Sequence, residues 1–375
     1  MTMYRINRHA PLARVARAMI PYLRVPTIGL VAAVVAMSAS LFISDPTRGE
    51  QPIPAKPNSG FVYTADEKGN SLSVIDLSIG RVDTVAIPIT PHNVQISSDR
   101  RFLYAVGSPA KKGESHGHGS ERGRLLVFDS AAVARGALTE IEVGSHPAHV
   151  IVDDKDTYAF VTNGSDDSVS VVDLAQRRVV REIRTGRYPH GLRMSPNGQE
   201  IYVANVNDGT ISEISTADLA NVATIEVGKE PVQVAFKADG RWVYTSLRAE
   251  NSVAVIDVVT RRVITKVHVG HGPIQTYATP DSRLVLVANQ GGATPDKTVS
   301  IVEVATNRVV KTIVTGKGAH GVVVSDDGRW AFVSNILDNS VSIIDIKSLA
   351  VVARFAVGGG PNGITLKNAD RSPRT

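Results

Sequence analysis

Residues 160–173 read FVTNGSDDSVSVVD, two stretches of alternating residues joined by a short polar turn. Alternation of apolar and small polar residues is typical of β-strands. The last residues of successive copies of the first stretch are 41, 57, 42, 41, 43 and 46 positions apart. The seven copies are Val62–Ala65, Leu103–Val106, Phe160–Asn163, Tyr202–Asn205, Val243–Ser246, Leu286–Asn289 and Phe332–Asn335. A period of this length is typical of β-propeller blades.

Each copy belongs to a unit of four predicted strands, which we name A to D from the ring centre outward. The copy itself is strand B, strand C follows it as in Ser168–Asp173, and strand D comes next as in Arg178–Thr185. The chain begins at a strand B, and its last such segment, Pro361–Lys367, is a strand A. The sequence therefore predicts an all-β fold, a seven-bladed β-propeller with four antiparallel strands per blade over residues 60–367. The C-terminal strand A joins the N-terminal trio of strands and closes the ring.

The segments Phe160–Asn163 and Tyr202–Asn205, each followed by a strand of the Ser-Val-Ser-Val-Val-Asp type, closely resemble the repeats of the YVTN β-propeller family. The resemblance covers about Gly60 to Lys367, and it implies the propeller fold but no single function. Relatives in this family include exported propellers such as the cytochrome d1-type haem domains of nitrite reductases, and the heavy subunits of amine dehydrogenases look like more distant relatives. The motif's Asn is missing at Ala65 and Ser246, and strand B of the second blade ends in Ala-Val-Gly.

The positive charge of the chain is concentrated at its N-terminus. The 375 residues have a formal net charge of +5, and residues 1–44 contain five Arg and no acidic residue, so the remainder is neutral overall. A neutral body lacks the charge that nucleic-acid-binding proteins use to hold the phosphate backbone, and we expect no nucleic acid as a partner. Because the chain has no Cys, disulfides, thiolate zinc sites, Cys-ligated iron–sulfur clusters and CxxCH haem attachment are excluded.

An apolar stretch without charges extends over residues 25–44, VPTIGLVAAVVAMSASLFIS. Its length is at the lower end of the range for a membrane-spanning helix, and its small residues also suit cleavage by a signal peptidase. Residues 1–44 are thus either a signal peptide or an N-terminal anchor in the inner membrane. Both place the following residues in the periplasm or another extracytoplasmic space, because the positive charge stays in the cytoplasm. Residues 45–59 are predicted to be a Pro-rich linker, and residues 368–375 a C-terminal tail.

Eight of the ten His residues map to one face of the predicted ring. Strands alternate in direction, so the D-to-A and B-to-C connections share a face. Six of the eight lie in D-to-A connections or at the start of strand A: His92, His146, His149, His190, His271 and His320. The other two, His116 and His118, lie in the B-to-C insertion of the second blade, at residues 107–123.

Each strand A begins with one polar residue that is predicted to lie near the central channel. These residues are His92, His149, His190, Gln233, Gln275, His320 and Asn362, and they form the candidate cofactor-binding set. Four of them, His92, His190, His320 and Asn362, directly follow the position that is usually Pro, whereas the other three come one residue later. Because adjacent residues of a strand point to opposite sides, this spacing favours the first four as the subset that faces the axis.

Neutral imidazole is the commonest metal ligand in proteins, and without Cys it is the leading ligand for copper, zinc, iron or nickel. The candidate metal ligands are His92, His190 and His320, together with His116 and His118 from the Ser-His-Gly-His-Gly loop. The resemblance implies a second option, a non-covalent d1-type haem with an axial His. A third option also stays open, in which the histidines were copied with their blades and only hydrogen-bond to backbone or water.

The sequence favours an exported binding or accessory protein of the cell envelope. Such a protein would present its His-rich face to a partner protein or a small ligand, in metal or haem handling or in respiratory electron transfer. The alternative is an oxidoreductase-like protein that itself carries a His-ligated metal or d1-type haem at the channel mouth. A lactonase-like hydrolase rests on fold analogy alone.

Overall fold

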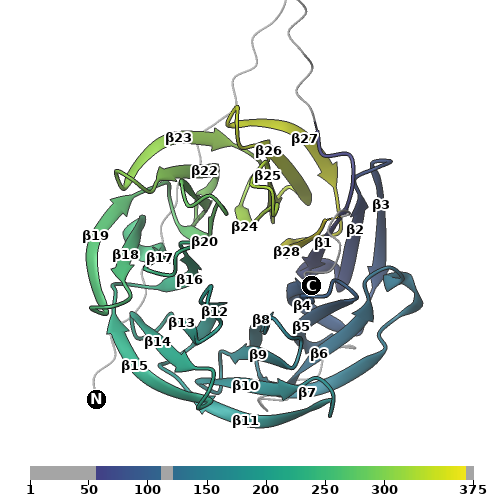
Figure 1. Cartoon of the computed structure of the whole chain (residues 1–375). Helices are drawn as coiled ribbons and strands as arrows, with labels where there is room; N and C mark the ends of the chain where they lie inside the picture. The colour runs from purple at the N-terminus through teal and green to yellow at the C-terminus, as the bar shows by residue number, and fades with distance from the viewer. Residues whose placement is uncertain (1–55, 111–120, 369–375) are drawn as a thin grey trace, which may run out of the picture. The chain divides into compact units, whose positions relative to one another are not determined.

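The computed structural model describes residues 56–110 and 121–368, and this part of the chain forms seven four-stranded antiparallel sheets. Figure 1 is viewed along the central axis of the ring and shows the sheets arranged as blades around a common centre. Blade 1 contains β28, β1, β2 and β3, blade 2 contains β4 to β7, and each later blade takes the next four strands in order. The predicted seven-bladed propeller is confirmed.

The two inner layers of the ring are made of strands A and B. The strands A are β4 (Ile89–Ile96), β8 (Pro147–Val152), β12 (Pro189–Met194), β16 (Pro231–Phe236), β20 (Pro273–Ala278), β24 (Ala319–Val324) and β28 (Pro361–Lys367). The strands B are β1 (Phe61–Asp66), β5 (Phe102–Pro109), β9 (Tyr158–Asn163), β13 (Glu200–Asn205), β17 (Trp242–Leu247), β21 (Leu284–Gly291) and β25 (Trp330–Asn335).

The two outer layers are made of strands C and D. The strands C are β2 (Ser71–Asp76), β6 (Arg122–Asp129), β10 (Ser168–Asp173), β14 (Thr210–Ser215), β18 (Ser252–Asp257), β22 (Pro295–Glu303) and β26 (Ser340–Asp345). The strands D are β3 (Arg81–Ala86), β7 (Thr139–Ser145), β11 (Arg178–Arg184), β15 (Ala220–Glu226), β19 (Arg262–His268), β23 (Arg308–Val314) and β27 (Ala350–Ala356). Short 3-10 helices are η1 (Glu67–Gly69), η2 (Val133–Arg135) and η3 (Arg248–Glu250).

The ring is closed by pairing of strands from the two ends of the propeller. β28 is antiparallel to β1, with Lys367 opposite Phe61 and Ile364 opposite Thr64. Blade 1 is therefore complete only when a strand more than 290 residues later in the chain is in place. This pairing leaves no free edge on the inner side of β1, as the sequence predicted.

The hydrophobic core lies between neighbouring blades. Tyr104 and Val106 of blade 2, for example, pack with Val150 and Val161 of blade 3 in one buried cluster. Strands B are buried on both faces because each is covered by the next blade on either side, whereas the outer strands D alternate between partly buried and exposed residues. The blades are therefore held together by apolar side chains, and polar residues are left for the ring's ends and centre.

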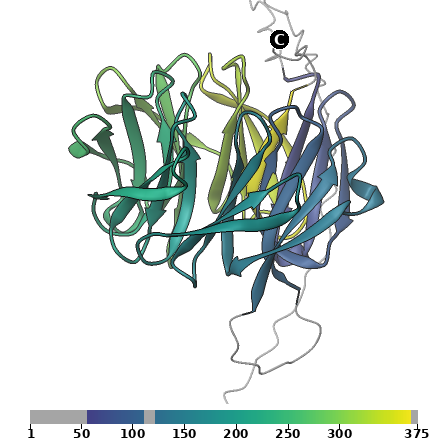
Figure 2. The ribbon, with the colours of Figure 1, turned by 60° about the horizontal axis from the view of Figure 1, so that its bottom comes forward.

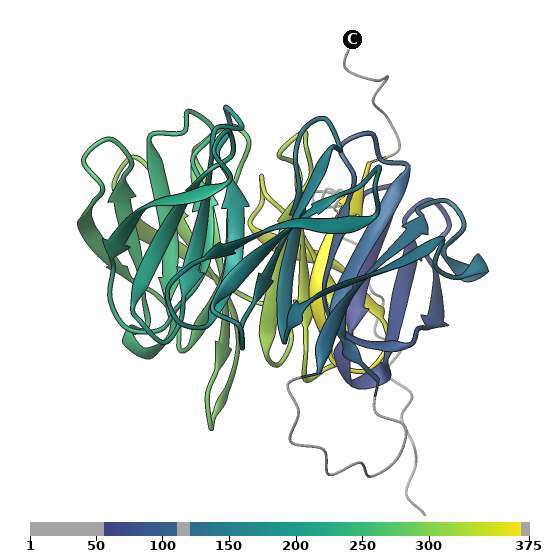
Figure 3. The same cartoon turned by 90° about the horizontal axis from the view of Figure 1, so that it is seen from below.

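The strands run between two faces of the ring, as the side views show (Figures 2 and 3). Strands A begin on the face that carries the D-to-A and B-to-C connections; we call it the His face, because His92, His149, His190 and His320 lie there. Among the described residues, the hairpin between β21 and β22 extends farthest on this face (Figure 3). His116, His118, the predicted segment 1–44 and most of the predicted linker and tail lie outside the described residues. Within the described residues, no helix is long and apolar enough to cross a membrane.

Strand pairing corrects the sequence alignment in part of the repeat. The motif's Asn lies opposite a Ser or Thr of strand C, as Asn163 lies opposite Ser168. In the three blades that lack this Asn, the same place is held by Asp66, Gly107 and Leu247. The alignment of Ala65 and Ser246 with the motif's Asn is therefore wrong by one residue. Side chains along a strand point alternately to its two faces. Where both faces are buried, either alignment places apolar residues in the core, so an apolar run does not fix the register of the strand.

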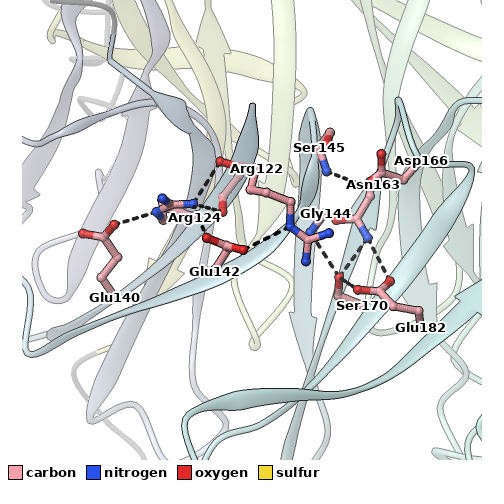
Figure 4. Close-up of polar contacts among 11 residues, drawn as sticks. Arg122, Arg124, Glu140, Glu142, Gly144, Ser145, Asn163, Asp166, Ser170 and Glu182 are labelled. Atoms are coloured by element: carbon pink, nitrogen blue, oxygen red, sulfur yellow. Dashed lines mark hydrogen bonds and ion pairs between the residues drawn. The ribbon is translucent and has the colours of Figure 1, made fainter. Parts of the chain in front are cut away.

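The motif's Asn ties strand B to strand C. Asn163 Nδ2 donates hydrogen bonds to the Oγ atoms of Ser168 and Ser170 at 3.0 and 2.8 Å; Figure 4 shows the second of these. The end of β7 in the neighbouring blade approaches this side chain so closely that a Cβ on Gly144 would lie 2.3 Å from Asn163 Cγ. The same arrangement recurs at Asn205, Asn289 and Asn335. These residues are part of the framework of the blade.

In blade 1 a carboxylate takes the place of this amide. Asp66 is completely buried and accepts hydrogen bonds from Thr64 Oγ1 at 2.7 Å and from Ser73 Oγ at 2.6 Å. Burial raises the pKa of Asp66 to about 6, although the hydroxyl hydrogen bonds oppose this rise. Folding therefore favours the protonated form of this carboxyl.

We expect Asp66→Asn to remove a pH dependence of the folding free energy. The folded-state pKa lies about two units above the unfolded value, so the contribution is complete below pH 4 and is lost as the pH rises through about 6. Two units correspond to about 3 kcal/mol, and about two thirds of it is lost between pH 4.5 and 7.5. Urea unfolding of both proteins at these two pH values measures the change. A stability difference between them that does not vary with pH would contradict the prediction.

An ion pair between a buried carboxylate and a half-exposed arginine joins blades 4 and 5. The side chain of Glu213 in β14 is only 5% exposed, and Arg261, in the turn between β18 and β19, donates to both of its oxygens at 2.6 and 2.7 Å. The hydroxyl of Tyr202 donates to the same carboxylate at 3.2 Å. Glu213 thus has a partner for each oxygen, which offsets the cost of burying its charge.

We expect Glu213→Ala to lower the free energy of unfolding by about 1–3 kcal/mol, because the buried hydroxyl of Tyr202 would lose its acceptor, whereas the half-exposed Arg261 can be hydrated. Glu142→Ala is the matched control, since Glu142 forms an exposed pair with Arg122, and exposed pairs contribute only about 0–1 kcal/mol. Urea unfolding of the two variants and the wild type makes the comparison. Equal losses of unfolding free energy in both variants would contradict the prediction, because the pair of Glu213 and Arg261 would then contribute no more than an exposed pair.

Candidate functional site

Three histidines from three consecutive blades meet at the axis on the His face. They are His92 in β4, His149 in β8 and His190 in β12. The ring centroids are 5.0 Å apart for His92 and His190, 5.0 Å for His149 and His190, and 5.7 Å for His92 and His149. One ring nitrogen of each lies within 4.8 Å of those of the other two. We call this group the His trio.

Backbone carbonyls of the next blade orient two members of the trio. His92 Nδ1 lies 3.0 Å from the carbonyl oxygen of Ala148, and His190 Nδ1 lies 3.2 Å from that of Val232. A carbonyl oxygen can only accept, so Nδ1 carries the proton in both rings and Nε2 keeps its lone pair. This support from outside the ligand set is the usual arrangement around metal-binding histidines.

The composition of the trio differs from the subset that the sequence favoured. His149 comes one residue later in its strand than His92 and His190 in theirs, yet it lies beside them. The reason is an irregularity in the strands A: pairing shifts between Pro147 and Val150 in β8, with equivalent shifts in β12, β16, β20 and β24. A bulge interrupts the alternation of side chains, so both offsets can reach the axis. The assignment of metal ligands itself stays a prediction.

The other predicted ring residues surround the trio. His320 is 8% exposed, and its Nδ1 has no hydrogen-bond partner among the described residues. Gln233 Nε2 lies 3.4 Å from His149 Nδ1, while the Gln275 amide oxygen accepts from the backbone N–H of Val322. These contacts link blades 3, 5, 6 and 7 across or around the channel.

A carboxylate that the sequence analysis did not single out stands near the trio. Glu67, the first residue of η1, accepts a hydrogen bond from Asn362 Nδ2 at 2.7 Å. It is close enough to His92 to raise the pKa of that ring, although burial outweighs this and lowers the pKa overall. Little in the sequence indicated that Glu67 lies near the trio, because it directly follows strand B, where polar loop residues are common.

Burial keeps the histidines of the channel neutral. It lowers the pKa of His320 to about 3 and holds those of His149 and His190 well below the usual value, with the neighbouring imidazoles adding to the effect. Neutral imidazoles have lone pairs free to bind a metal ion at neutral pH.

The remaining histidines of the His face are exposed and lie apart from the trio. His146 Nε2 is 3.2 Å from the hydroxyl of Tyr188, and the two rings form a pair at the rim. His271 is exposed, and its backbone N–H donates to Asp296. The structure thus brings together three of the seven predicted ring positions as a cluster of imidazoles.

Comparison with known proteins supports the fold. The model of the family described as YNCE-like beta-propeller matches residues 145–261 and 222–372, which together make up more than half of the chain. Among curated proteins, none matches this chain.

Solved structures with the same fold belong to proteins of different kinds. One is hydrazine synthase of Kuenenia stuttgartiensis, with 21% identity and a TM-score of 0.62 over 74% of this chain and 95% of that one. A functionally unknown protein of Desulfotomaculum acetoxidans has 16% identity and a TM-score of 0.69 over 83% of this chain and 100% of its own. A proposed 6-phosphogluconolactonase of Bacteroides fragilis has 16% identity and a TM-score of 0.67 over 84% and 100%. At these identities the similarity shows the fold alone.

Proposed function

This chain belongs to the YNCE-like beta-propeller family, and from that premise we propose that it is an exported binding protein of the cell envelope for a divalent transition-metal ion. The His trio would hold the ion at the channel mouth. The export signal or anchor in residues 1–44 would place the propeller outside the cytoplasm, where the His face is available to a partner protein or to free metal.

The convergence of His92, His149 and His190 is the observation that supports this function. Metal–imidazole bonds of about 2.0–2.1 Å place tetrahedral ligands about 3.3 Å apart. The ring nitrogens of the trio are within 4.8 Å of one another, so small side-chain rotations bring them to bonding distance. Three neutral nitrogen ligands without Cys suit zinc and copper. Three protein ligands also leave a coordination position open, as in catalytic metal sites, so an oxidoreductase-like use of the ion is the second candidate.

A haem fits the channel less well than a single ion. The cavity in the channel beside His149 has a volume of about 160 Å³, which is smaller than the 300–1,000 Å³ typical of pockets for organic ligands. The three rings also converge on one point, whereas a haem needs a flat space beside one axial ligand. We therefore assign no role to a haem within the channel.

The test of this function is metal uptake by the full-length protein, purified without a polyhistidine tag. After dialysis against Zn²⁺, Cu²⁺ or Co²⁺, we expect one ion per chain, and Co²⁺ should give the visible absorption of a tetrahedral site. Affinity should fall as the pH is lowered, because protons compete for the imidazoles. Retention of less than a tenth of an ion per chain for all three metals at pH 7.5 would overturn the proposal.

A further inference from the structure

A polar cavity lies inside the channel, and His149 of the His trio forms part of its wall. Its volume is about 160 Å³, and its walls come from the strands A of all seven blades. It is well above the 10–15 Å³ that one ordered water needs and below the size of pockets for organic ligands. Its size therefore suits a small ion with a few water molecules.

The end of the cavity away from the His face is bridged by an ion pair. Arg100 of blade 2 donates from Nη2 to Asp326 of blade 7 at 2.7 Å, and from Nη1 to the carbonyl oxygen of Asn368 at 3.3 Å. Blade 1 lies between these two blades, so the pair spans part of the opening. The charges of Arg100 and Asp326 balance each other.

Arg193 introduces a positive charge into the cavity. It belongs to β12 of blade 4, and its guanidinium lies 5.1 Å from the ring centroid of Tyr277 in β20 of blade 6. Because blade 5 separates these blades, the Arg193 side chain crosses the channel in front of β16, and both residues line the cavity. Within the described residues, no carboxylate lies at ion-pair distance from Arg193, so its guanidinium hydrogens face the cavity without an anionic partner.

Of the two amides beside Arg193, that of Gln275 leaves its donor group for a ligand in the cavity, whereas Gln233 Nε2 lies at hydrogen-bond distance from His149 Nδ1. The carbonyl oxygen of Gln275 accepts from the N–H of Val322, and that of Gln233 accepts from the N–H of Val234 at 2.9 Å. With these oxygens occupied, the NH₂ group of Gln275 is left for the cavity, where it adds to the donors of Arg193. A cavity with one unbalanced cation and free N–H donors is suited to an anion.

We propose that a small oxyanion, such as a short carboxylate or an inorganic oxyanion of similar size, binds in this cavity between Arg193 and the His trio. The inference rests on the proposed function in one respect: an ion held by three neutral imidazoles has an open coordination position, which an oxyanion oxygen fills from the channel side. The anion also offsets the charge of the metal and of Arg193, which would otherwise repel each other inside the channel. Arg193 thus selects the anion that reaches the metal.

The test uses the metal-free, full-length protein and ¹⁴C-formate in equilibrium dialysis at low chloride. We expect one saturable site per chain, with at least tenfold weaker binding in Arg193→Gln and no more than threefold weaker binding in Arg193→Lys, which keeps the charge. Arg81→Gln is the matched control, because Arg81 forms an exposed pair with Asp83 on the outermost strand of blade 1. Thermal melting verifies that each variant is folded.

The outcomes separate this inference from the metal proposal. Binding of formate that depends on Arg193 in a protein that takes up no metal would support the anion site and leave the metal proposal overturned. Uptake of metal without saturable formate binding by the wild type would overturn the anion site alone. Competition by chloride as effective as that by formate would show a general anion site, and the assignment to oxyanions would be wrong.

Discussion

Replacing His149 and His190 together with alanine is expected to abolish stoichiometric Zn²⁺ binding, and His190→Ala alone is expected to weaken it more than about 100-fold. The loss of a partner that merely orients a ligand already costs about 10–100-fold in metal affinity, and removal of a ligand costs more. His190 also has its Nε2 lone pair directed away from the backbone by the bond from Nδ1 to the Val232 carbonyl, so alanine removes an oriented donor. Isothermal titration calorimetry with Zn²⁺, supported by metal analysis after dialysis, measures the change.

The matched control for this experiment is His271→Ala. His271 is exposed on the same face and is not part of the His trio, so its removal should leave the affinity within about twofold of wild type. His320→Ala is informative as well, because the spacing in the sequence favoured His320 as a ligand whereas the geometry favours His149. Equal affinity in wild type and in the double variant would show that the trio does not bind the ion.

Deletion of the segment that forms β28, residues 361–367, is expected to prevent formation of a stable closed ring. Ile364 and Leu366 are buried between blades 1 and 7, and each contributes about 1.5–3 kcal/mol by its burial. The deletion also removes the whole ladder with β1 and leaves a buried strand edge open. Since most domains are stable by only about 5–15 kcal/mol, these losses should unfold or aggregate the protein. Near-UV circular dichroism and size-exclusion chromatography record the result.

A circular permutant distinguishes the loss of the strand from the loss of the chain end. Lys367 lies opposite Phe61, so a short turn can join the end of β28 to the start of β1 as a hairpin. A chain that begins at Pro361, passes through this turn to Phe61 and ends at Gly360 retains every strand of the ring. We expect it to fold with the same size and melting behaviour as the wild type. A folded deletion variant would show that closure by this pair is unimportant. An unfolded permutant would show that the position of the chain ends matters as well as the presence of the strand.

The repeat made the fold predictable, and its periodicity also explains the errors. Strand bounds such as Ser168–Asp173 and Pro361–Lys367 agree with the structure, because turn residues and alternating strands mark both ends. The alignment of Ala65 and Ser246 was wrong by one residue. Strands B are buried on both faces, so their apolar runs carry no information about which side each residue takes.

The candidate site was only partly predictable for a related reason. The sequence identified the ring positions but not that His149 would lie with His92 and His190, since a bulge in the strands A changes the direction of side chains without changing the sequence pattern. Arg193 was not singled out, because a single basic residue in a strand gives no sign that its side chain crosses the channel to Tyr277. Arg193 and Tyr277 belong to blades that are not neighbours, and whether residues of such blades meet depends on the curvature of the closed ring.

The pairing of Phe61 with Lys367 also sets an order of events during synthesis. While the ribosome adds the six blades between them, β1 must wait with one edge unpaired, and this long separation makes the last step of assembly slow. A chain that ends before residue 361 would keep the inner edge of β1 exposed. Proteases and chaperones can recognise such an edge and thereby distinguish an unfinished chain from a folded one.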